Sequence, residues 1–426
     1  MIKNILHTLG SRLIVSLLNL LLLFITTKLM GAENKGEISL LILNVSLASI
    51  FSGLFGGPSL VYLIPRFPFK TLFSLNYGWS LITSLLMTLL IIIGFLPSTT
   101  APNMFFAIAL LECLVSVNMM ILLGRNKITR HNLLLIIKSI ILVGTLSALH
   151  LNGELLDYDL FEKAYFASMS IVFIVSLAMI ARSTKSNESF GKSLQQTARE
   201  SLSFGFLVQS GNIAQLLNYR LSFYFLELLI HPPAQALIRI GIYSATLQIA
   251  EALWQFARSV STVQYAAVSN MENKSEGLSV SLRLGKLNYS VTIIGILLLL
   301  IPGESFYSSL LGGEFGEVKT HLYFLAPGIV ALSLSNAFSH YFAGVGLHRF
   351  NTQSSVFGLI LSVILGYFAI LEYGTLGAAA VASLVYVSQT LYQFIMLQKQ
   401  DNVKWNALML QKKDIKAFSK LWQNRF

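Results

Sequence analysis

Long apolar runs recur along this chain and restrict its fold more than any other feature of the sequence. Runs of about 20 mainly apolar residues have the length of a helix that crosses a hydrocarbon core about 30 Å thick. Only 12% of the 426 residues are charged and 54% are hydrophobic, whereas soluble domains carry about a quarter charged residues. A membrane barrel would show alternating segments of about ten residues, which the sequence lacks. The sequence therefore predicts an all-α polytopic membrane protein.

The apolar runs predict about 12 membrane-spanning helices. The first run is too long for a cleaved signal peptide, so it is expected to be the first span. We expect two six-helix bundles around a central cavity: an N-terminal bundle (1–182), a cytoplasmic linker (183–203), a C-terminal bundle (204–397) and a basic cytoplasmic tail (398–426). The approximate spans are 9–30, 38–63, 75–97, 103–124, 132–151, 163–182, 204–229, 239–268, 286–303, 321–343, 352–371 and 375–397.

Short motifs indicate how the spans are arranged. Gly36-Glu37-Ile38-Ser39 opens the second span, and Gly241-Ile242-Tyr243-Ser244 opens the eighth. This echo favours two halves that are parallel repeats about an axis along the membrane normal, a plan known in transporters. Ser49, Gly53 and Gly57 have the small-xxx-small spacing that lets two helices approach closely.

The distribution of Lys and Arg predicts the orientation. With an even number of spans both termini share one side, and 21 of the 30 basic residues fall in loops on that side. Five lie on the opposite side and four lie within spans. The positive-inside rule then makes both termini cytoplasmic. The net charge of +11 is explained by loops that face anionic lipid, so no nucleic-acid partner is expected. The tail around Phe418 and Trp422 fits either an amphipathic helix on the inner leaflet or a solvated segment.

Ionisable side chains inside spans are costly, which makes each one a functional hypothesis. Stripes of polar residues on single helix faces imply an interior lined by several bases, most simply a water-filled cavity. The stripes comprise Arg12, Ser16, Asn19 and Thr26 on the first span, His131, Lys138 and Thr145 on the fifth, Gln209, Arg220, Tyr224 and Glu227 on the seventh, and Ser244, Glu251, Gln255, Arg258, Thr262 and Tyr265 on the eighth.

Several of these residues also have structural explanations. Arg12 and Lys138 are close enough to an interface to snorkel. Glu251 lies two turns from Arg258 and is placed to neutralise it. Glu112, on the fourth span, fits either a helix-packing hydrogen bond or a role in proton coupling.

The sequence shows no signature of an enzyme. It has no phosphate-binding glycine-rich loop and no HExxH pair. Its one cysteine, Cys113, excludes an internal disulfide and a cysteine-based metal site. We therefore expect no cofactor and no metal. The extracytoplasmic loops, of which 304–320 is the longest, are too short for the catalytic domain that a membrane glycan polymerase or ligase would need.

Motifs at the span junctions carry a family resemblance over nearly the whole chain. With these motifs, the chain resembles the polysaccharide transporter family, the Wzx-type O-antigen flippases of the multidrug/oligosaccharidyl-lipid/polysaccharide (MOP) exporter superfamily. The motifs are TTKLMGAENKGEISLL (26–41), NYRLSFYFLELL (218–229), IGIYSATLQIAEALWQFARSVST (240–262), LLGGEFGEV (310–318), YFAGVGLHR (341–349) and YGTLGAAAVAS (373–383).

The resemblance implies a flippase in a bacterial cytoplasmic membrane. Its substrate would be an undecaprenyl-pyrophosphate-linked oligosaccharide, its surroundings membrane lipids, and its neighbours other polysaccharide-assembly membrane proteins. Arginine guanidinium groups can hold a pyrophosphate bidentately, which makes Arg220 and Arg258 the first candidates. Arg12 and Lys138 would be secondary contacts. Side-chain amides on the same faces would hydrogen-bond sugars, and these are Asn19, Gln209 and Gln255.

One departure from the family pattern concerns ion coupling. Family members often carry an acidic residue shortly after the arginine of the seventh span, where this chain has Ser222. Coupling would then pass through Glu227, Glu251 or Glu112. The leading alternative is a cation-coupled multidrug exporter of the same superfamily, whose cavity should contain acids without excess base. A glycan polymerase or ligase and a non-transporting envelope scaffold are the remaining alternatives.

Overall fold

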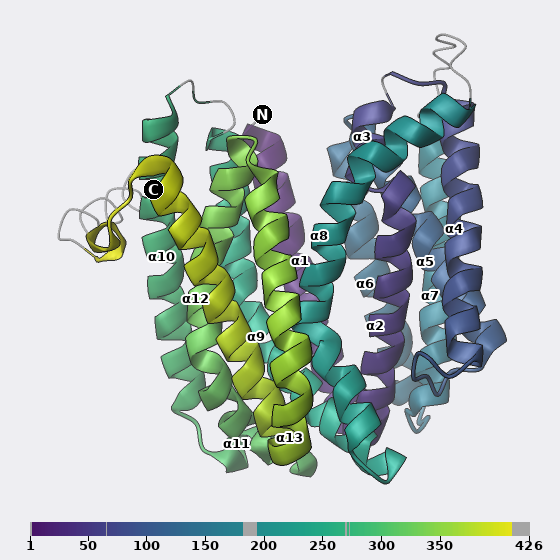
Figure 1. Ribbon diagram of the computed structural model, residues 1–426. Coiled ribbons are helices and arrows are strands. Elements are labelled where there is room, and N and C mark those ends of the chain that lie inside the picture. The colour runs from purple at the N-terminus through teal and green to yellow at the C-terminus, as the bar shows by residue number, and fades with distance from the viewer. Residues whose placement is uncertain (1, 65, 182–193, 269–270, 272, 411–426) are drawn as a thin grey trace. The chain divides into compact units, whose positions relative to one another are not determined.

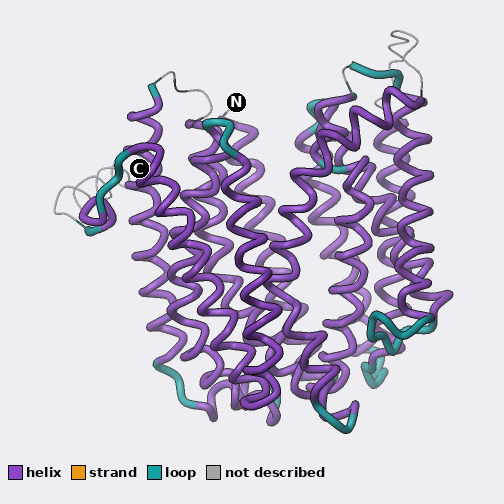
Figure 2. The backbone as a smooth tube through the Cα atoms, viewed as in Figure 1, coloured by secondary structure: helices purple, strands orange, loops and turns teal. Residues whose placement is uncertain are grey.

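The computed structural model describes residues 2–64, 66–181, 194–268, 271 and 273–410, and helices account for most of them (Figure 1). Short loops join the helices, and these ranges contain no strand (Figure 2). The α-helices are α1 (Ile2–Phe24), α2 (Gly31–Gly56), α3 (Pro58–Leu63), α4 (Phe69–Ile92), α5 (Pro102–Gly124), α6 (Ile128–Leu151), α7 (Tyr158–Ala181), α8 (Leu194–Leu229), α9 (Pro233–Val268), α10 (Lys274–Leu300), α11 (Glu304–Leu311), α12 (Val318–Gly344) and α13 (His348–Asp401). A π-helix, η1 (Ile25–Leu29), and two 3-10 helices, η2 (Gly313–Glu317) and η3 (Trp405–Leu408), complete the elements.

Ten helical segments of the described chain are long and apolar enough to cross a membrane. One of them, α13, is 54 residues long and contains Gly374 with non-helical torsions (φ 55°, ψ −130°). Ser354 Oγ donates to the Gln389 carbonyl and Tyr392 Oη to Gln353 Oε1, so the two parts pack antiparallel. The break at Gly374 divides α13 into two spans, and the 36-residue α8, which is more polar, adds another. The total confirms the predicted set of about 12.

The helices overlap the predicted spans, but several of their ends differ from the predicted bounds, and α10 begins at Lys274, 12 residues before the predicted start at 286. Helix α8 begins at Leu194, inside the segment expected to be a linker. Helix α2 ends at Gly56, and Pro58 starts the separate short helix α3 within the predicted span 38–63. Pro327 lies inside α12 without ending it. The central part of the linker and the expected amphipathic tail fall on residues 182–193 and 411–426, outside the described residues, so the division into two bundles of six stays a prediction.

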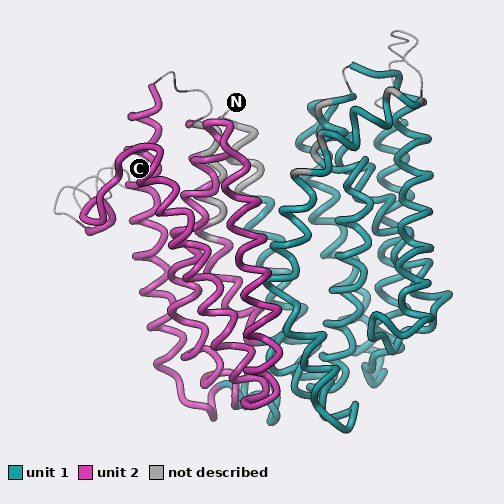
Figure 3. The backbone as a smooth tube through the Cα atoms, viewed as in Figure 1, with its two compact units in different colours: residues 1–245, 307–316 teal, residues 246–306, 317–426 magenta. Residues whose placement is uncertain are grey.

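The described chain divides into two compact units (Figure 3). Unit 1 comprises residues 1–245 and 307–316, and unit 2 comprises residues 246–306 and 317–426. In unit 1, an apolar core that includes Leu63, Phe67 and Leu122 joins α3, α4, α5 and α7. In unit 2, an aromatic core that includes Phe342 and Phe394 joins α12 and α13. Each unit therefore has its own core.

The outer helices bury polar side chains and expose apolar ones. The buried face of α4 contains Asn76, Ser80, Thr83, Ser84 and Thr88. Its exposed face consists largely of leucine and isoleucine: Leu81, Ile82, Leu85, Leu86, Leu89 and Ile92 are each more than 40% exposed. Such a continuous apolar surface would cause aggregation in water but suits contact with lipid. The chain is thus a multi-pass membrane protein.

Small residues bring α2 and α8 into close contact, as their spacing predicts. A β-carbon added to Gly53 or Gly57 would overlap the side-chain amide of Gln209 in α8. One added to Gly205 would overlap the carbonyl oxygen of Leu54 in α2. The absence of side chains at these positions therefore sets the spacing of the two helices.

Candidate functional site

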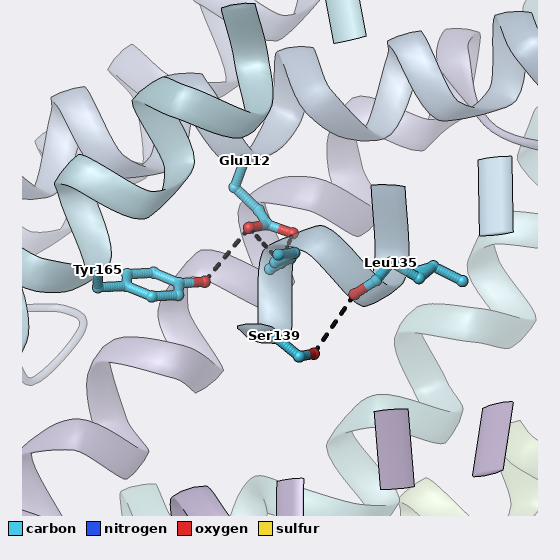
Figure 4. A network of polar contacts seen from close by, with 5 residues as sticks. Glu112, Leu135, Ser139 and Tyr165 are labelled. Carbon is cyan, nitrogen blue, oxygen red and sulfur yellow. Dashed lines mark hydrogen bonds and ion pairs between the residues drawn. The ribbon is translucent and has the colours of Figure 1, made fainter. Parts of the chain in front are cut away.

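An ion pair between two neighbouring helices of unit 1 forms the centre of the candidate site. Lys138 Nζ of α6 lies 2.7 Å from both carboxylate oxygens of Glu112 in α5. Tyr165 Oη of α7 donates to Glu112 Oε2 at 3.2 Å. Figure 4 shows the Glu112 carboxylate directed toward Tyr165, with Ser139 turned back toward its own helix. Three consecutive spans thus meet at one carboxylate.

The ion pair lies deep in its spans. Glu112 follows the start of α5 by ten residues and precedes its end by twelve. Lys138 follows the start of α6 by ten residues and precedes its end by thirteen. At 1.5 Å per residue, both lie about 15 Å or more from either helix end. Lys138 therefore does not reach an interface by snorkelling, which was one of its two predicted explanations, and its charge is balanced by Glu112 instead.

The surroundings of the pair determine what it can do. The Lys138 and Glu112 side chains are 28% and 16% exposed, so the pair is sheltered without being sealed. An isolated charge at such depth would be strongly disfavoured, whereas a hydrogen-bonded pair is tolerated. An anionic group that reached Lys138 could take the place of Glu112. Tyr165 would then remain as a hydrogen-bond donor to the released carboxylate.

Further hydrogen bonds join the helices around the pair. Tyr77 Oη donates to Asn118 Oδ1 at 2.7 Å, and Asn118 Nδ2 donates to Ser176 Oγ at 2.7 Å. The Ser52 and Ser80 hydroxyls lie 2.8 Å apart. We assign these residues a packing role, because each makes its bond to another helix of the same unit. They were not among the predicted site residues, although Asn118 and Ser176 stand out in the sequence as polar residues amid apolar spans.

Arg220 lies in α8, also in unit 1. Its side chain is half-buried, and Nη1 donates to the Tyr219 carbonyl at 3.3 Å. The guanidinium carbon lies 5.5 Å from the centroid of the Phe223 ring, within the range of a cation–π interaction. Tyr224, expected on the same stripe, donates instead to Asn44 Oδ1 of α2 at 2.6 Å. Arg220 is therefore the candidate base of α8, and Tyr224 is a helix-packing residue.

Gln209 is placed for packing and not for contact with sugars. Its side chain is 4% exposed. The amide nitrogen donates to the Gly53 carbonyl at 3.1 Å, and the amide oxygen accepts from Asn212 Nδ2 at 2.8 Å. Both ends of the amide are thus engaged, which explains the polar residue without invoking a ligand.

The other predicted site residues are dispersed over both units. Asn19 in α1 is exposed, while Arg12 in α1 and Glu227 in α8 are half-buried. Glu251 and Gln255 lie half-buried in the part of α9 that belongs to unit 2. Arg258 lies in α9, but its side chain is outside the described part of the structure. Of all the predicted residues, Glu112 and Lys138 are the pair that the structure joins by an ion pair in the described chain.

Metal-binding geometry is absent from the described residues, where no group of three or more His, Cys, Asp or Glu side chains could hold an ion. Cys113 is buried and has a hydrogen-bond contact with Ser84 at 3.8 Å.

Solved structures with the same fold are transporters. The chain is similar to a structure described as lipid II flippase MurJ in an inward closed conformation, with a TM-score of 0.73 and 14% identity over 93% of this chain and 88% of that one. An inward-facing multidrug resistance MATE family transporter gives a TM-score of 0.68 and 14% identity over 93% and 99%. A MOP superfamily transporter from Pyrococcus furiosus gives 0.61 and 15% over 92% and 93%. No family model and no curated protein sequence matches the chain. The chain therefore has the fold of MOP superfamily transporters.

Proposed function

We propose that this protein is a flippase of the bacterial cytoplasmic membrane. Its substrate is an undecaprenyl-pyrophosphate-linked oligosaccharide, the repeat unit of an O-antigen or another surface polysaccharide. The protein moves the head group outward by alternating access, and both its termini are cytoplasmic. The observation that carries the proposal is a lysine near the middle of a candidate membrane span, held by a carboxylate that an anionic head group could replace.

The chemistry of the substrate supports this choice. A lipid-linked oligosaccharide keeps its chain in the bilayer while its charged pyrophosphate and its sugars need a polar path. Lys138 and Arg220 offer basic groups within spans of unit 1. A lysine ammonium binds phosphate as a point charge, and an arginine binds it through paired hydrogen bonds. The chain as a whole carries 30 basic and 19 acidic residues.

Exchange of partners at Lys138 gives a mechanism. When the pyrophosphate approaches Lys138, it competes with the Glu112 carboxylate for the same ammonium. The displaced carboxylate keeps the Tyr165 hydrogen bond but has lost its counter-charge inside the membrane. Protonation removes that charge, because an unpaired carboxylate is strongly disfavoured there. Departure of the head group reverses both changes, so substrate binding and proton uptake occur together at one site.

A multidrug exporter of the MATE type is the second candidate. The likeness to MATE structures supports it, since one of them matches 99% of its own length to this chain. In that case Glu112 would bind a cationic drug or a coupling ion, with Lys138 as its resting partner. The Pyrococcus furiosus transporter is described as having a binding pocket of reverse polarity that suggests a different function, so charge in this fold varies with function. The side chains, and not the fold, distinguish the two candidates.

The test is a complementation experiment. In a host that lacks the gene, the wild-type protein should restore surface polysaccharide and clear lipid-linked precursor from the cytoplasmic leaflet. Lys138→Ala should fail in both when its amount in the membrane is matched to that of the wild type. Lys163→Ala is the matched control, because this exposed lysine of α7 lies in the same unit outside the ion pair. Unchanged glycan together with raised sensitivity to cationic drugs in the deletion strain would contradict the flippase and favour the exporter.

A further inference from the structure

Three parts of the chain meet at one end of unit 1. They are the turn between α1 and α2, the first residues of α9, and the segment 307–316. The last of these, shown in the colour of unit 1 in Figure 3, contains the end of α11 and most of η2. We name this group of contacts the outer junction, because the proposed orientation places the α1–α2 turn outside the cell.

The start of α2 crosses the start of α9 in a reciprocal way. A β-carbon on Gly36 would overlap the carbonyl oxygen of Leu237, and one on Gly241 would overlap that of Ala32. Ser39 Oγ donates to Ser244 Oγ at 2.8 Å, a pair separated by 205 positions. Gly36 and Gly241 are separated by the same number, as are Ala32 and Leu237. The two motifs of the sequence echo therefore contact one another, each glycine facing the backbone of the other helix.

A second set of contacts covers this crossing. Glu314 Oε2 of η2 accepts a hydrogen bond from the Ala32 backbone nitrogen at 2.8 Å. Ala32 is in the first turn of α2, where backbone N–H groups have no partner within the helix and favour an anion. Lys28 Nζ donates to the Ser309 carbonyl at 3.2 Å. Ser309 is in the last turn of α11, where unpaired carbonyls favour a cation. The Glu314 carboxylate thus lies at the N-terminal end of α2, which favours an anion. The Lys28 ammonium lies at the C-terminal end of α11, which favours a cation.

The two sets of contacts differ in how readily they can open. Glu314 and Lys28 are exposed, so water can replace either partner, and such helix-end contacts are worth about 1 kcal/mol or less each. Phe315, the residue after Glu314, is fully buried and anchors the segment. At the glycine crossing, backbone packs against backbone, with Ser39 and Ser244 5% and 2% exposed. Weak, exposed contacts hold the segment that lies over a tightly closed crossing.

We propose that the segment 307–316 is a latch that keeps the α2–α9 crossing closed toward the outside. Glu314 and Lys28 hold the latch on the α1–α2 turn, and their release precedes separation of the crossing in the outward-open state. That this side of the crossing faces outward rests on the proposed orientation. The latch itself does not depend on which substrate is carried, because all its contacts are made by the chain with itself. Exchange between two states requires a contact that forms in one and breaks in the other, and these contacts are suited to that role.

Thiol labelling tests the latch in the full-length protein. The background is Cys113→Ala, and the reporter is Ser244→Cys at the crossing. A membrane-impermeant maleimide should label this cysteine slowly in intact cells. Glu314→Ala should raise the rate about fivefold, the factor that corresponds to about 1 kcal/mol. Glu304→Ala, which removes a carboxylate from the start of α11 without touching α2, should leave the rate unchanged.

Two further measurements keep the outcome decisive. Leu155→Cys, in the exposed turn between α6 and α7, reports orientation and folding, and its labelling should be equal in all latch variants. If Leu155→Cys reacts only in inverted vesicles, the proposed orientation has failed, and the latch is then measured from that side. An unchanged Ser244→Cys rate in both Glu314→Ala and Lys28→Ala, with Leu155→Cys reacting normally, would overturn the latch.

Discussion

A charged side chain within a span needs a partner on another helix, and Lys138 shows how the partner is chosen. Lys138 is ten residues from the nearer end of α6, beyond the reach of its own side chain to an interface. Glu112 is at a matching depth in α5, and Tyr165 supplies a further donor. Removing either charge leaves the other unpaired within a span, which is strongly disfavoured.

The ion pair predicts non-additive effects on stability. Lys138→Met alone and Glu112→Gln alone should each lower the Tm of the purified protein by several degrees, because each leaves one unpaired charge within a span. The double variant carries no charge at the site and should recover most of the lost Tm. Thermal unfolding followed by intrinsic fluorescence measures this, and transport should stay lost in all three. A double variant whose loss equals the sum of the single losses would show that the pair is not coupled.

At the scale of elements, the membrane reverses the usual segregation of side chains, and glycine sets the spacing between helices. The buried face of α10 contains Ser281, Lys286, Asn288 and Thr292, while its exposed face contains isoleucine and leucine. Asn288 Nδ2 donates to Ser261 Oγ of α9 at 3.1 Å. Because lipid is as apolar as a leucine side chain, helices in a membrane associate through close packing and hydrogen bonds.

Glycine substitutions separate packing from helix propensity. Gly205→Ala should destabilise the protein, since its β-carbon would overlap the Leu54 carbonyl and push α8 away from α2. Gly78→Ala in α4 and Gly144→Ala in α6 are matched controls with nothing within 4 Å of the added carbon. The controls should be neutral or stabilising by up to about 1 kcal/mol, because alanine is the better helix former. Equal Tm changes in all three variants would refute the close-packing argument.

At the scale of the whole molecule, the two compact units are not two consecutive halves of the chain. The chain passes from unit 1 to unit 2 within α9 and returns to unit 1 for residues 307–316. A continuous helix therefore contributes to both units, and a short segment from late in the sequence completes the first one. The orientation of the molecule in the bilayer is a prediction from charge, because most Lys and Arg residues fall in predicted loops on the side of the termini.

The predicted orientation is open to a direct test. In a Cys113→Ala background, a cysteine at Lys127, in the loop between α5 and α6, should react with an impermeant maleimide only in inverted vesicles. A cysteine at Lys319, near the start of α12, should react in intact cells. Lys127 is exposed and Lys319 is half-buried, so the reactivity of each cysteine is compared between intact cells and inverted vesicles at the same position. The opposite pattern would place both termini outside.

Local sequence alone determined the fold class and the positions of nearly all the spans. The bilayer imposes a length on each apolar run, and that length is visible in a window of about 20 residues. The same windows located the charged residues within spans and the small residues where α2 meets α8. The turn at Gly374 was also expected, because two runs separated by a few residues must reverse direction to cross again.

Only the tertiary structure decided which polar residues meet. Glu112 and Lys138 were identified as separate candidates, but their pairing depends on how α5 and α6 are rotated against one another. Gln209 is engaged with Gly53, 156 positions away, for the same reason. The contact of Glu314 with Ala32 joins positions 282 apart. Helix periodicity fixes which residues share a face, whereas the neighbour that each face meets is set by packing between distant segments.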